Sequence, residues 1–187
     1  DDDCENILRW MQQKHNDKIY GLNILGDIYR SFELAEKYGV SFIQIDSVCG
    51  HLEPDLDEEY ESMLKFLHRN SDCTVLGGVR FKYQPVNSGR TLAEDLKIGM
   101  GRCDAVVCTG EGTGLATPMD KVEKFKQILG DFPVIIGAGV TIDMVEACSR
   151  NSDGVIVGSW FKDNHRAEYS VNEDSVKDFM LRWNAHT

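Results

Sequence analysis

The sequence lacks paired cysteines, long apolar runs and an excess of positive charge. No two of its six cysteines form a Cys-x-x-Cys pair, which excludes the common zinc and dithiol motifs. No run reaches the ~18 apolar residues of a membrane-spanning helix. Lys and Arg total 20 against 31 Asp and Glu, for a formal net charge of −11. This balance argues against binding to nucleic acid or to an anionic membrane, because the chain repels phosphate on average.

The cysteines and histidines predict no metal or cofactor. His51 stands near Glu53 and Asp55, but this spacing matches no strong metal template. The acidic run 53–61 is better explained as the solvated start of a helix. Because the cysteines are scattered and no charged-then-apolar leader opens the chain, we expect six reduced thiols and a cytoplasmic location.

The length and composition fit one soluble domain, residues 1–187. A chain of 187 residues with 42% hydrophobic and 27% charged residues can bury a core without disulfides. Six β-branched or apolar runs alternate with stretches of helical spacing. The expected strands are 19–25, 41–46, 74–82, 104–108, 133–136 and 154–157. Strands that alternate with helices predict a parallel sheet covered by helices.

The positions of the glycine-rich turns favour a (β/α)8 TIM barrel over an open doubly wound sheet. The first strand-to-helix turn, Leu25-Gly26-Asp27, lacks the Gly-x-Gly-x-x-Gly fingerprint of dinucleotide-binding folds. Six strands are about two βα units short of a complete barrel, which typically takes ~250 residues. We expect those units to be missing from the N-terminus, through truncation or proteolysis, or to be supplied by a partner. Assembly as a homo-oligomer stays open.

Two successive strands end in glycine and then enter an expected helix. Glycine lets an anion approach the backbone closely, and free N–H groups at a helix N-terminus bind phosphate. The sequence therefore predicts a phosphate clamp at these two turns. Its expected members are Gly137, Ala138, Gly139, Gly158 and Ser159. The alternative is that these glycines only make tight turns.

The segment Val107–Gly114 follows another strand and is polar and glycine-rich. Loops at this end of a barrel strand carry active-site residues. Glu111 is a candidate acid or base, and Thr109, Gly110 and Thr113 are candidates for substrate binding. The alternative is a simple connection.

Polar residues also end other expected strands. Asn23 and Arg80 are candidates for substrate binding, and Asp46 and Lys82 are candidates for catalysis. Lys82 near Asp46 would suit acid–base or Schiff-base chemistry, since burial can depress the pKa of a lysine. Arg80 and Lys82 should share a face, because strand side chains alternate. The alternative for Asp46 and Lys82 is a structural ion pair.

Four segments resemble the BtpA/SgcQ family of TIM-barrel-like proteins. They are 21–25, 104–114, 133–140 and 153–162. The resemblance implies a barrel whose first two βα units precede Asp1. It implies no particular reaction, because none is established for the family. Where the family strand carries an acid and a Lys-His pair, this chain has Gly78, Lys82 and Tyr83. Met144 stands where the family commonly has Asn.

These observations predict a barrel that binds a phosphorylated small molecule at its C-terminal face. The leading hypothesis is an enzyme acting on a sugar phosphate or a nucleotide-like metabolite. A second is a lyase, isomerase or synthase of the tryptophan or histidine biosynthesis type, because tryptophan synthase α chains carry similar late turns. A third is a ligand-sensing or assembly factor without chemistry, which the missing acid and histidine leave open.

Overall fold

The computed structural model describes residues 2–186 and contains the six expected strands. They are β1 (Gly21–Leu22), β2 (Phe42–Cys49), β3 (Thr74–Val79), β4 (Ala105–Cys108), β5 (Val134–Ile136) and β6 (Gly154–Val155). The helices are α1 (Asp2–Lys14), α2 (Ile28–Tyr38), α3 (Pro54–Arg69), α4 (Leu92–Met100), α5 (Met119–Leu129), α6 (Val145–Asn151) and α7 (Glu173–Asn184). Three short 3-10 turns are η1 (Ile142–Met144), η2 (Ser159–Phe161) and η3 (Asp163–His165).

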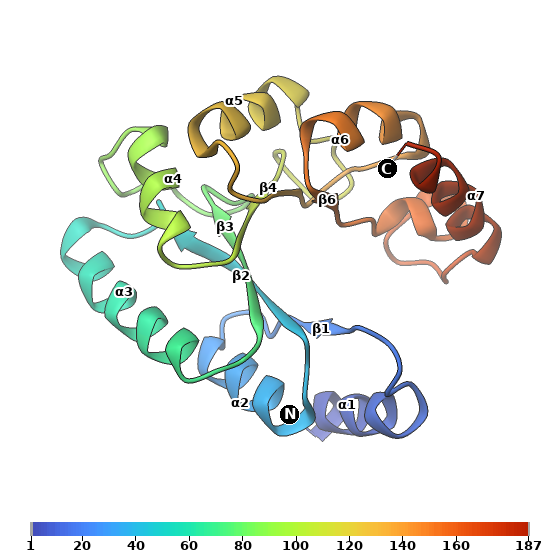
Figure 1. Cartoon of the computed structure of the whole chain (residues 1–187), viewed down its shortest axis with the longest axis horizontal. Helices are drawn as coiled ribbons and strands as arrows, with labels where there is room; N and C mark the ends of the chain where they lie inside the picture. The colour runs from blue at the N-terminus through green and yellow to red at the C-terminus, as the bar shows by residue number, and fades with distance from the viewer. Residues whose placement is uncertain (1, 187) are drawn as a thin grey trace.

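The strands form one parallel sheet in which spatial order follows chain order, from β1 to β6. The sheet curls into an arc, with α2 to α6 along its outer side and α1 and α7 at its two ends (Figure 1). Each strand thus returns beside its predecessor through a covering helix, which is the βα repeat of a TIM barrel. The predicted fold class is confirmed as a half-barrel of six strands.

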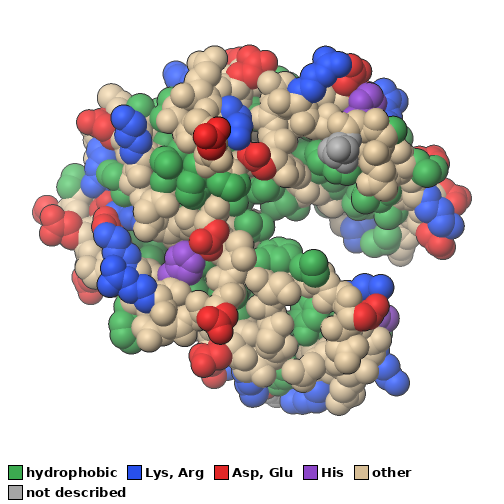
Figure 2. Space-filling view, viewed as in Figure 1, with side chains coloured by type: hydrophobic (Ala, Val, Ile, Leu, Met, Phe, Trp, Pro, Cys, Tyr) green, Lys and Arg blue, Asp and Glu red, His purple; other side chains and the backbone are tan. Residues whose placement is uncertain are grey.

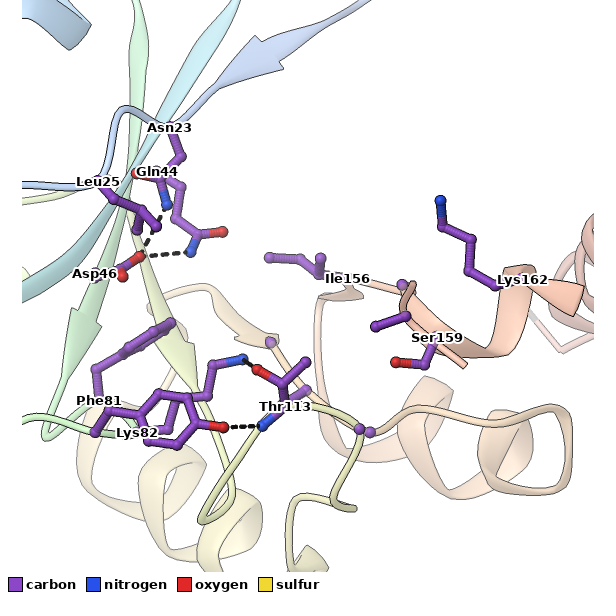
Figure 3. Close-up of a pocket in the computed structure, with 17 residues that line it drawn as sticks. Asn23, Leu25, Gln44, Asp46, Phe81, Lys82, Thr113, Ile156, Ser159 and Lys162 are labelled. Atoms are coloured by element: carbon purple, nitrogen blue, oxygen red, sulfur yellow. Dashed lines mark hydrogen bonds between the residues drawn. The ribbon is translucent and has the colours of Figure 1, made fainter. Parts of the chain in front are cut away.

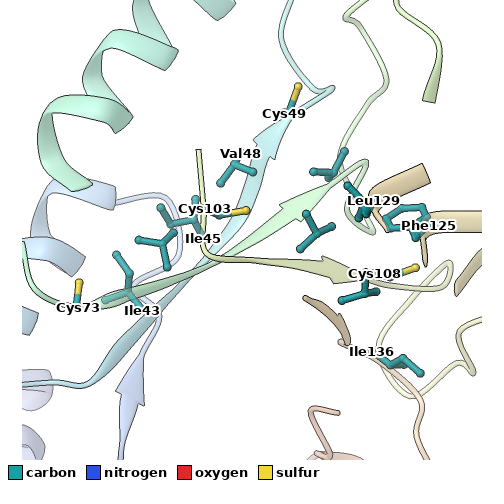
Figure 4. Close-up of a cluster of buried hydrophobic side chains, with 14 of the residues drawn as sticks. Ile43, Ile45, Val48, Cys49, Cys73, Cys103, Cys108, Phe125, Leu129 and Ile136 are labelled. Carbon is teal, nitrogen blue, oxygen red and sulfur yellow. The ribbon is translucent and has the colours of Figure 1, made fainter. Parts of the chain in front are cut away.

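The hydrophobic core lies between the sheet and the outer helices (Figure 4). Ile43 and Val106 from the strands and Leu64, Leu96 and Phe125 from the helices are at most 1% exposed. Burying side chains of this size stabilises the fold by roughly 1.5–3 kcal/mol each. The short strands are apolar on both faces because helices cover one face and the arc encloses the other.

Local sequence signals fix several helix ends. Thr91 and Glu94 form a capping box at the start of α4. Asp27 caps α2 through the amide of Arg30, and Gly39 ends that helix with a φ of 64°. Among residues 2–186, no helix is both long and apolar enough to cross a membrane.

Two sequence expectations about local structure are wrong. The third strand ends at Val79 rather than Lys82, because Arg80 adopts a φ of 48° and breaks the alternation. The turn after β6 enters η2, of three residues, rather than a regular helix, whereas the turn after β5 enters η1, which α6 continues directly. A phosphate site at the turn after β6 would therefore depend on individual amides and not on the dipole of a long helix.

Candidate functional site

A cleft of about 420 Å³ lies at the carboxyl ends of the strands. Every strand or the loop after it contributes, and representative lining residues are Asn23, Asp46, Lys82, Thr113, Gly137 and Ser159. Figure 2 shows that the molecule is hollowed between its α1–α2 side and its α6–α7 side, with hydrophobic side chains along the inner wall. In parallel βα folds this edge of the sheet is where ligands bind.

One wall of the cleft holds a carboxylate between two amides. Oδ1 of Asp46 accepts hydrogen bonds from Nδ2 of Asn23 at 2.9 Å and from Nε2 of Gln44 at 3.2 Å (Figure 3). Both amides are neutral, so they fix the orientation of the carboxylate without neutralising its charge. This leaves Asp46 able to interact with a ligand or a proton in the cleft.

Lys82 faces the same cleft but is not paired with Asp46. Its Nζ lies 3.3 Å from Oγ1 of Thr113, and no salt bridge to Asp46 forms within residues 2–186. The hydroxyl of Tyr83 accepts a 2.7 Å hydrogen bond from the amide of Thr113, and this contact lowers the pKa of Tyr83. The structure therefore brings Asp46, Lys82 and Thr113 together around one cavity.

The two glycine turns lie side by side across from Asp46. Because β5 pairs with β6, both turns line a smaller hollow of about 170 Å³ that adjoins the cleft. Within the described chain, the amides of Ala138, Gly139, Gly158 and Ser159 donate to no protein acceptor. Gly139, Gly158 and Ser159 line the hollow, whereas the buried Ala138 lines the main cleft. Neighbouring unpaired amides can form a nest suited to an anion.

Gly137 requires a correction, because its amide is already engaged. It donates to the carbonyl of Cys108 at 2.8 Å and extends the pairing between β4 and β5. A Cβ at Gly137 would lie 2.4 Å from Cγ1 of Val107. This glycine is therefore required for packing beside the cleft and does not supply a free amide.

Gly139 brings the loop after β4 against the turn after β5. Its φ is 65°, and an added Cβ would lie 2.1 Å from the carbonyl oxygen of Leu115. A Cβ on Gly114 would lie 3.5 Å from Oγ of Ser159. Three consecutive βα loops thus meet at the hollow, and no residue other than glycine fits at position 139 without strain.

Arg80, which the sequence predicts as a substrate-binding residue, does not line the main cleft. Its positive φ turns the side chain toward α4, where Nε donates to Oδ2 of the buried Asp95 at 2.8 Å. The same region holds Arg102, which bonds both carboxylate oxygens of Asp57 at 2.7 and 3.1 Å, and Arg90, which bonds Asp57 at 2.8 Å. These five residues are called the arginine cluster below.

The arginine cluster also corrects the interpretation of the acidic run 53–61. Asp57 in that run is only 2% exposed, so it is not solvated. Burial alone would raise the pKa of Asp57, but hydrogen bonds from Arg102 and Arg90 bring this pKa below its ordinary value. Glu61 also pairs with Arg102, at 2.6 Å.

The loop after β4 divides between structural and cleft-facing residues. Thr109 is 1% exposed, and its Oγ1 accepts from the amide of Lys82 at 2.9 Å. Glu111 and Gly110 face a separate hollow of about 330 Å³ that also includes Lys121. Of the residues predicted in this loop, only Thr113 lines the main cleft. Thr109, Gly110 and Glu111 therefore lie outside the main cleft, and their predicted roles in substrate binding and catalysis stay predictions.

Sequence reasoning missed Lys162 and Gln44 as cleft residues. Lys162 lines the cleft beyond Ser159, and its Nζ forms no ion pair within residues 2–186 (Figure 3). A lysine three residues after a glycine-serine turn, in an otherwise acidic chain, was the available signal. Lys82 and Lys162 bring two cations to the cleft against the single carboxylate of Asp46.

Gly78 does not line the cleft, but its backbone packs closely against that of Asp46. At Gly78, where the resemblance implies an acid, a Cβ would lie 2.0 Å from the carbonyl oxygen of Asp46. This backbone therefore has no room for an acidic side chain there.

Burial raises the pKa of the Cys49 thiol to about 11, so this thiol stays protonated near neutral pH.

Comparison with known proteins places the chain in a family and in a fold group. The model of the BtpA family matches residues 11–185. An uncharacterized protein of Thermococcus kodakarensis is 29% identical over 166 residues, which cover 86% of this chain and 63% of the relative. A tryptophan synthase alpha chain of Streptococcus mutans is 27% identical over 150 residues, which cover 80% of this chain and 56% of that protein. The chain therefore spans less than two thirds of the length of these relatives.

Solved structures with low sequence identity share the fold. A structure described as native KDPGal has a TM-score of 0.63 at 14% identity, covering 96% of this chain and 75% of that chain. N-(5'-phosphoribosyl)anthranilate isomerase from Pyrococcus furiosus has a TM-score of 0.58 at 16% identity, covering 95% of this chain and 80% of that chain. At these identities the likeness establishes the fold alone.

Proposed function

This chain belongs to the BtpA family, and we propose that it binds a phosphorylated small molecule in the cleft and acts on it as an enzyme. The phosphate is bound at the turns after β5 and β6, and the reacting part of the ligand lies between Asp46 and Lys82. The observation that carries this proposal is that Gly139, Gly158 and Ser159, whose amides have no protein acceptor in the described chain, line one hollow beside the cleft.

The turns after β5 and β6 suit a phosphate because they combine donors with positive charge. Gly139, Gly158 and Ser159 line the hollow with free amides, Ala138 adds one at the adjoining cleft, and the Ser159 hydroxyl is a further donor. Lys162 supplies a cation on the same side of the cleft. Hydrogen bonds to an ionised acceptor are about twice as strong as neutral ones. A phosphate here would therefore be held despite the chain's net charge of −11.

The opposite wall supplies groups that can move a proton. The amides of Asn23 and Gln44 hold Oδ1 of Asp46, while Lys82 approaches from the loop after β3. Because no salt bridge joins Asp46 and Lys82, each can interact with a ligand placed between them. In this arrangement Asp46 accepts a proton and Lys82 donates one.

A second candidate is a lyase, isomerase or synthase that acts on a phosphorylated intermediate of the tryptophan or histidine type. It is favoured by the 27% identity with a tryptophan synthase alpha chain and by the fold shared with an N-(5'-phosphoribosyl)anthranilate isomerase. Both candidates bind phosphate at the turns after β5 and β6, called the phosphate grip below, and they differ in the substrate. Turnover of one such intermediate, lost in Asp46→Ala and Lys82→Ala, would favour this second candidate.

The phosphate grip is tested by titrating inorganic phosphate into the purified chain by calorimetry. Ser159→Asp places a negative charge in the hollow, and we expect it to abolish phosphate binding while the thermal unfolding temperature changes little. The control is Ser62→Asp, which adds the same charge on the exposed side of α3. Equal phosphate binding by the wild type and Ser159→Asp would refute the grip.

Catalysis is tested separately from binding. Phosphorylated metabolites are first screened by thermal shift, because a ligand that binds the native state raises its apparent stability. Those that bind are then assayed for conversion. Conversion that survives Asp46→Ala and Lys82→Ala unchanged would exclude both residues from the mechanism. Tight binding without conversion of any compound would favour a ligand-sensing protein.

A further inference from the structure

A second pocket of about 320 Å³ adjoins the cleft between the loop after β1 and the upper part of β2. β1 pairs with β2 only as far as Ile43, so the loop that follows β1 leaves a space beside the remainder of β2. Asn23, Gln44 and Asp46 line both the cleft and this pocket. A ligand in the cleft can therefore extend past Asp46 into the second pocket.

Two buried polar atoms in this pocket have no hydrogen-bond partner. Oγ of Ser47 and Nδ1 of His51 are both shielded by the protein and unpaired. Ser47 is only 6% exposed, although it lines the pocket. A buried polar group without a partner is destabilising, and the great majority of such groups in proteins are satisfied. Two in one pocket indicate that a bound group supplies their hydrogen bonds.

The surroundings of these two atoms restrict the chemistry of that group. Of the residues that line the pocket, only Asp46 carries a formal charge. Burial lowers the pKa of His51, which keeps its ring neutral near pH 7. The ring of His51 packs edge-on against Tyr60 at 5.1 Å, and Ile24 and Ile28 add apolar surface. The pocket therefore disfavours an anion and suits an uncharged group with both donor and acceptor atoms.

We propose that Ser47 and His51 form a subsite for the uncharged, hydroxyl- or amide-bearing end of the ligand whose phosphate is held at the turns after β5 and β6. This proposal rests on the proposed function, and it assigns the ligand a direction across the cleft. The phosphate lies beside Ser159 and Lys162, and the neutral polar end lies beyond Asp46. The ligand class is thus a phosphate ester of a polyol, sugar or nucleoside without a second anionic end.

The subsite is tested by calorimetry with four probes. Inorganic phosphate reports the grip alone, glucose 6-phosphate and uridine 5'-monophosphate carry neutral polar ends, and 6-phosphogluconate carries a carboxylate. We expect at least one of the two neutral esters to bind about tenfold more tightly than inorganic phosphate, and 6-phosphogluconate to show no such gain. Ser47→Ala and His51→Phe should each reduce this gain in affinity over inorganic phosphate by about fivefold. That is the loss expected for one neutral hydrogen bond. The affinity for inorganic phosphate should not change.

The controls separate this subsite from the phosphate grip and from loss of folding. Ser47→Ala removes an unpaired buried hydroxyl, so it should fold at least as well as the wild type, and Ser62→Ala is the matched exposed control. If phosphate binds but Ser47→Ala leaves the gain intact, or if neither neutral ester gains over phosphate, the subsite is refuted. If inorganic phosphate binds neither the wild type nor any variant, the grip itself fails.

Discussion

The arginine cluster and the turns after β5 and β6 are both polar, but the cluster pairs its charges within the protein and the turns leave hydrogen-bond donors unpaired. In the cluster, Arg102 and Asp57 are buried and bond each other, while Arg80 bonds Asp95. At the turns, the amides of Gly139, Gly158 and Ser159 and the Nζ of Lys162 have no protein partner within the described chain. The sequence showed charge in the first region and mainly glycine in the second.

This difference separates structural polarity from binding capacity. A buried charge must be paired, because desolvation without a partner costs several kcal/mol. An amide that lines an open cleft can instead donate its hydrogen bond to water until a ligand replaces that water. The proposed binding site therefore lies at the turns with unpaired donors rather than at the paired charges of the arginine cluster.

The largest expected effect comes from breaking the cluster. Arg102→Met leaves Asp57 buried with fewer donors, and we expect the free energy of unfolding to fall by about 3–5 kcal/mol. Urea denaturation followed by circular dichroism measures this change. The control is Arg150→Met, which removes the exposed ion pair with Glu146 and should cost less than about 1 kcal/mol. A similar small loss for both variants would show that the cluster is not structural.

A smaller loss of stability is expected at the turn after β5. Gly139→Ala combines a φ of 65° with a Cβ 2.1 Å from the carbonyl oxygen of Leu115, and we expect a cost of about 3 kcal/mol and lost phosphate affinity. The matched variant is Gly39→Ala, at a φ of 64° in the left-handed helical region with no atom within 4 Å. There the backbone penalty alone should cost about 1 kcal/mol. Equal losses would show that the close approach to Leu115 is unimportant.

Acid should weaken the cluster progressively. The pKa of Asp57 is lower in the folded chain than its ordinary value, so its stabilising contribution is present above about pH 4 and is lost as the pH falls through the folded pKa. Urea unfolding between pH 7 and pH 2.5 measures this dependence. We expect Asp57→Asn to be less stable than the wild type at pH 7 but to lose less stability on acidification. An unchanged acid dependence would exclude Asp57 as a contributor.

The smallest expected effect is at Lys162, where we expect a substitution to change phosphate binding but not folding. Lys162→Ala should weaken inorganic phosphate binding by about tenfold, the loss of one charge-assisted hydrogen bond. Unfolding should be unchanged, because Nζ of Lys162 has no protein partner in residues 2–186. Lys124→Ala is the matched control, since Lys124 is exposed on α5. An equal effect of both variants would indicate only a general effect of charge.

Much of the fold was predictable because its signals are local. All six strands were expected, since each is a short apolar run between helical stretches. The glycine turns were expected as neighbours because they follow consecutive strands. The ends of elements were less predictable, as at Arg80, where one positive φ ends β3 early and redirects a side chain.

The candidate site was only partly predictable because it depends on side-chain direction. Asp46, Lys82 and Thr113 do line the cleft, whereas Arg80 and Thr109 serve the surrounding structure. Sequence spacing says which face of a strand a residue occupies, but loops have no such period. The role of a polar loop residue is therefore decided by what folds against it.

The sequence by itself determined the alternation of strands and helices, the parallel half-barrel and the two late glycine turns. Those features follow from hydrophobic period and backbone freedom, which act over a few residues. Only the tertiary structure decided that Asp57 pairs with Arg102, 45 residues away, and that Lys162 joins Asp46 at one cleft. Such pairings follow from how the strands and helices pack, because charges far apart in the chain meet only after the core has formed.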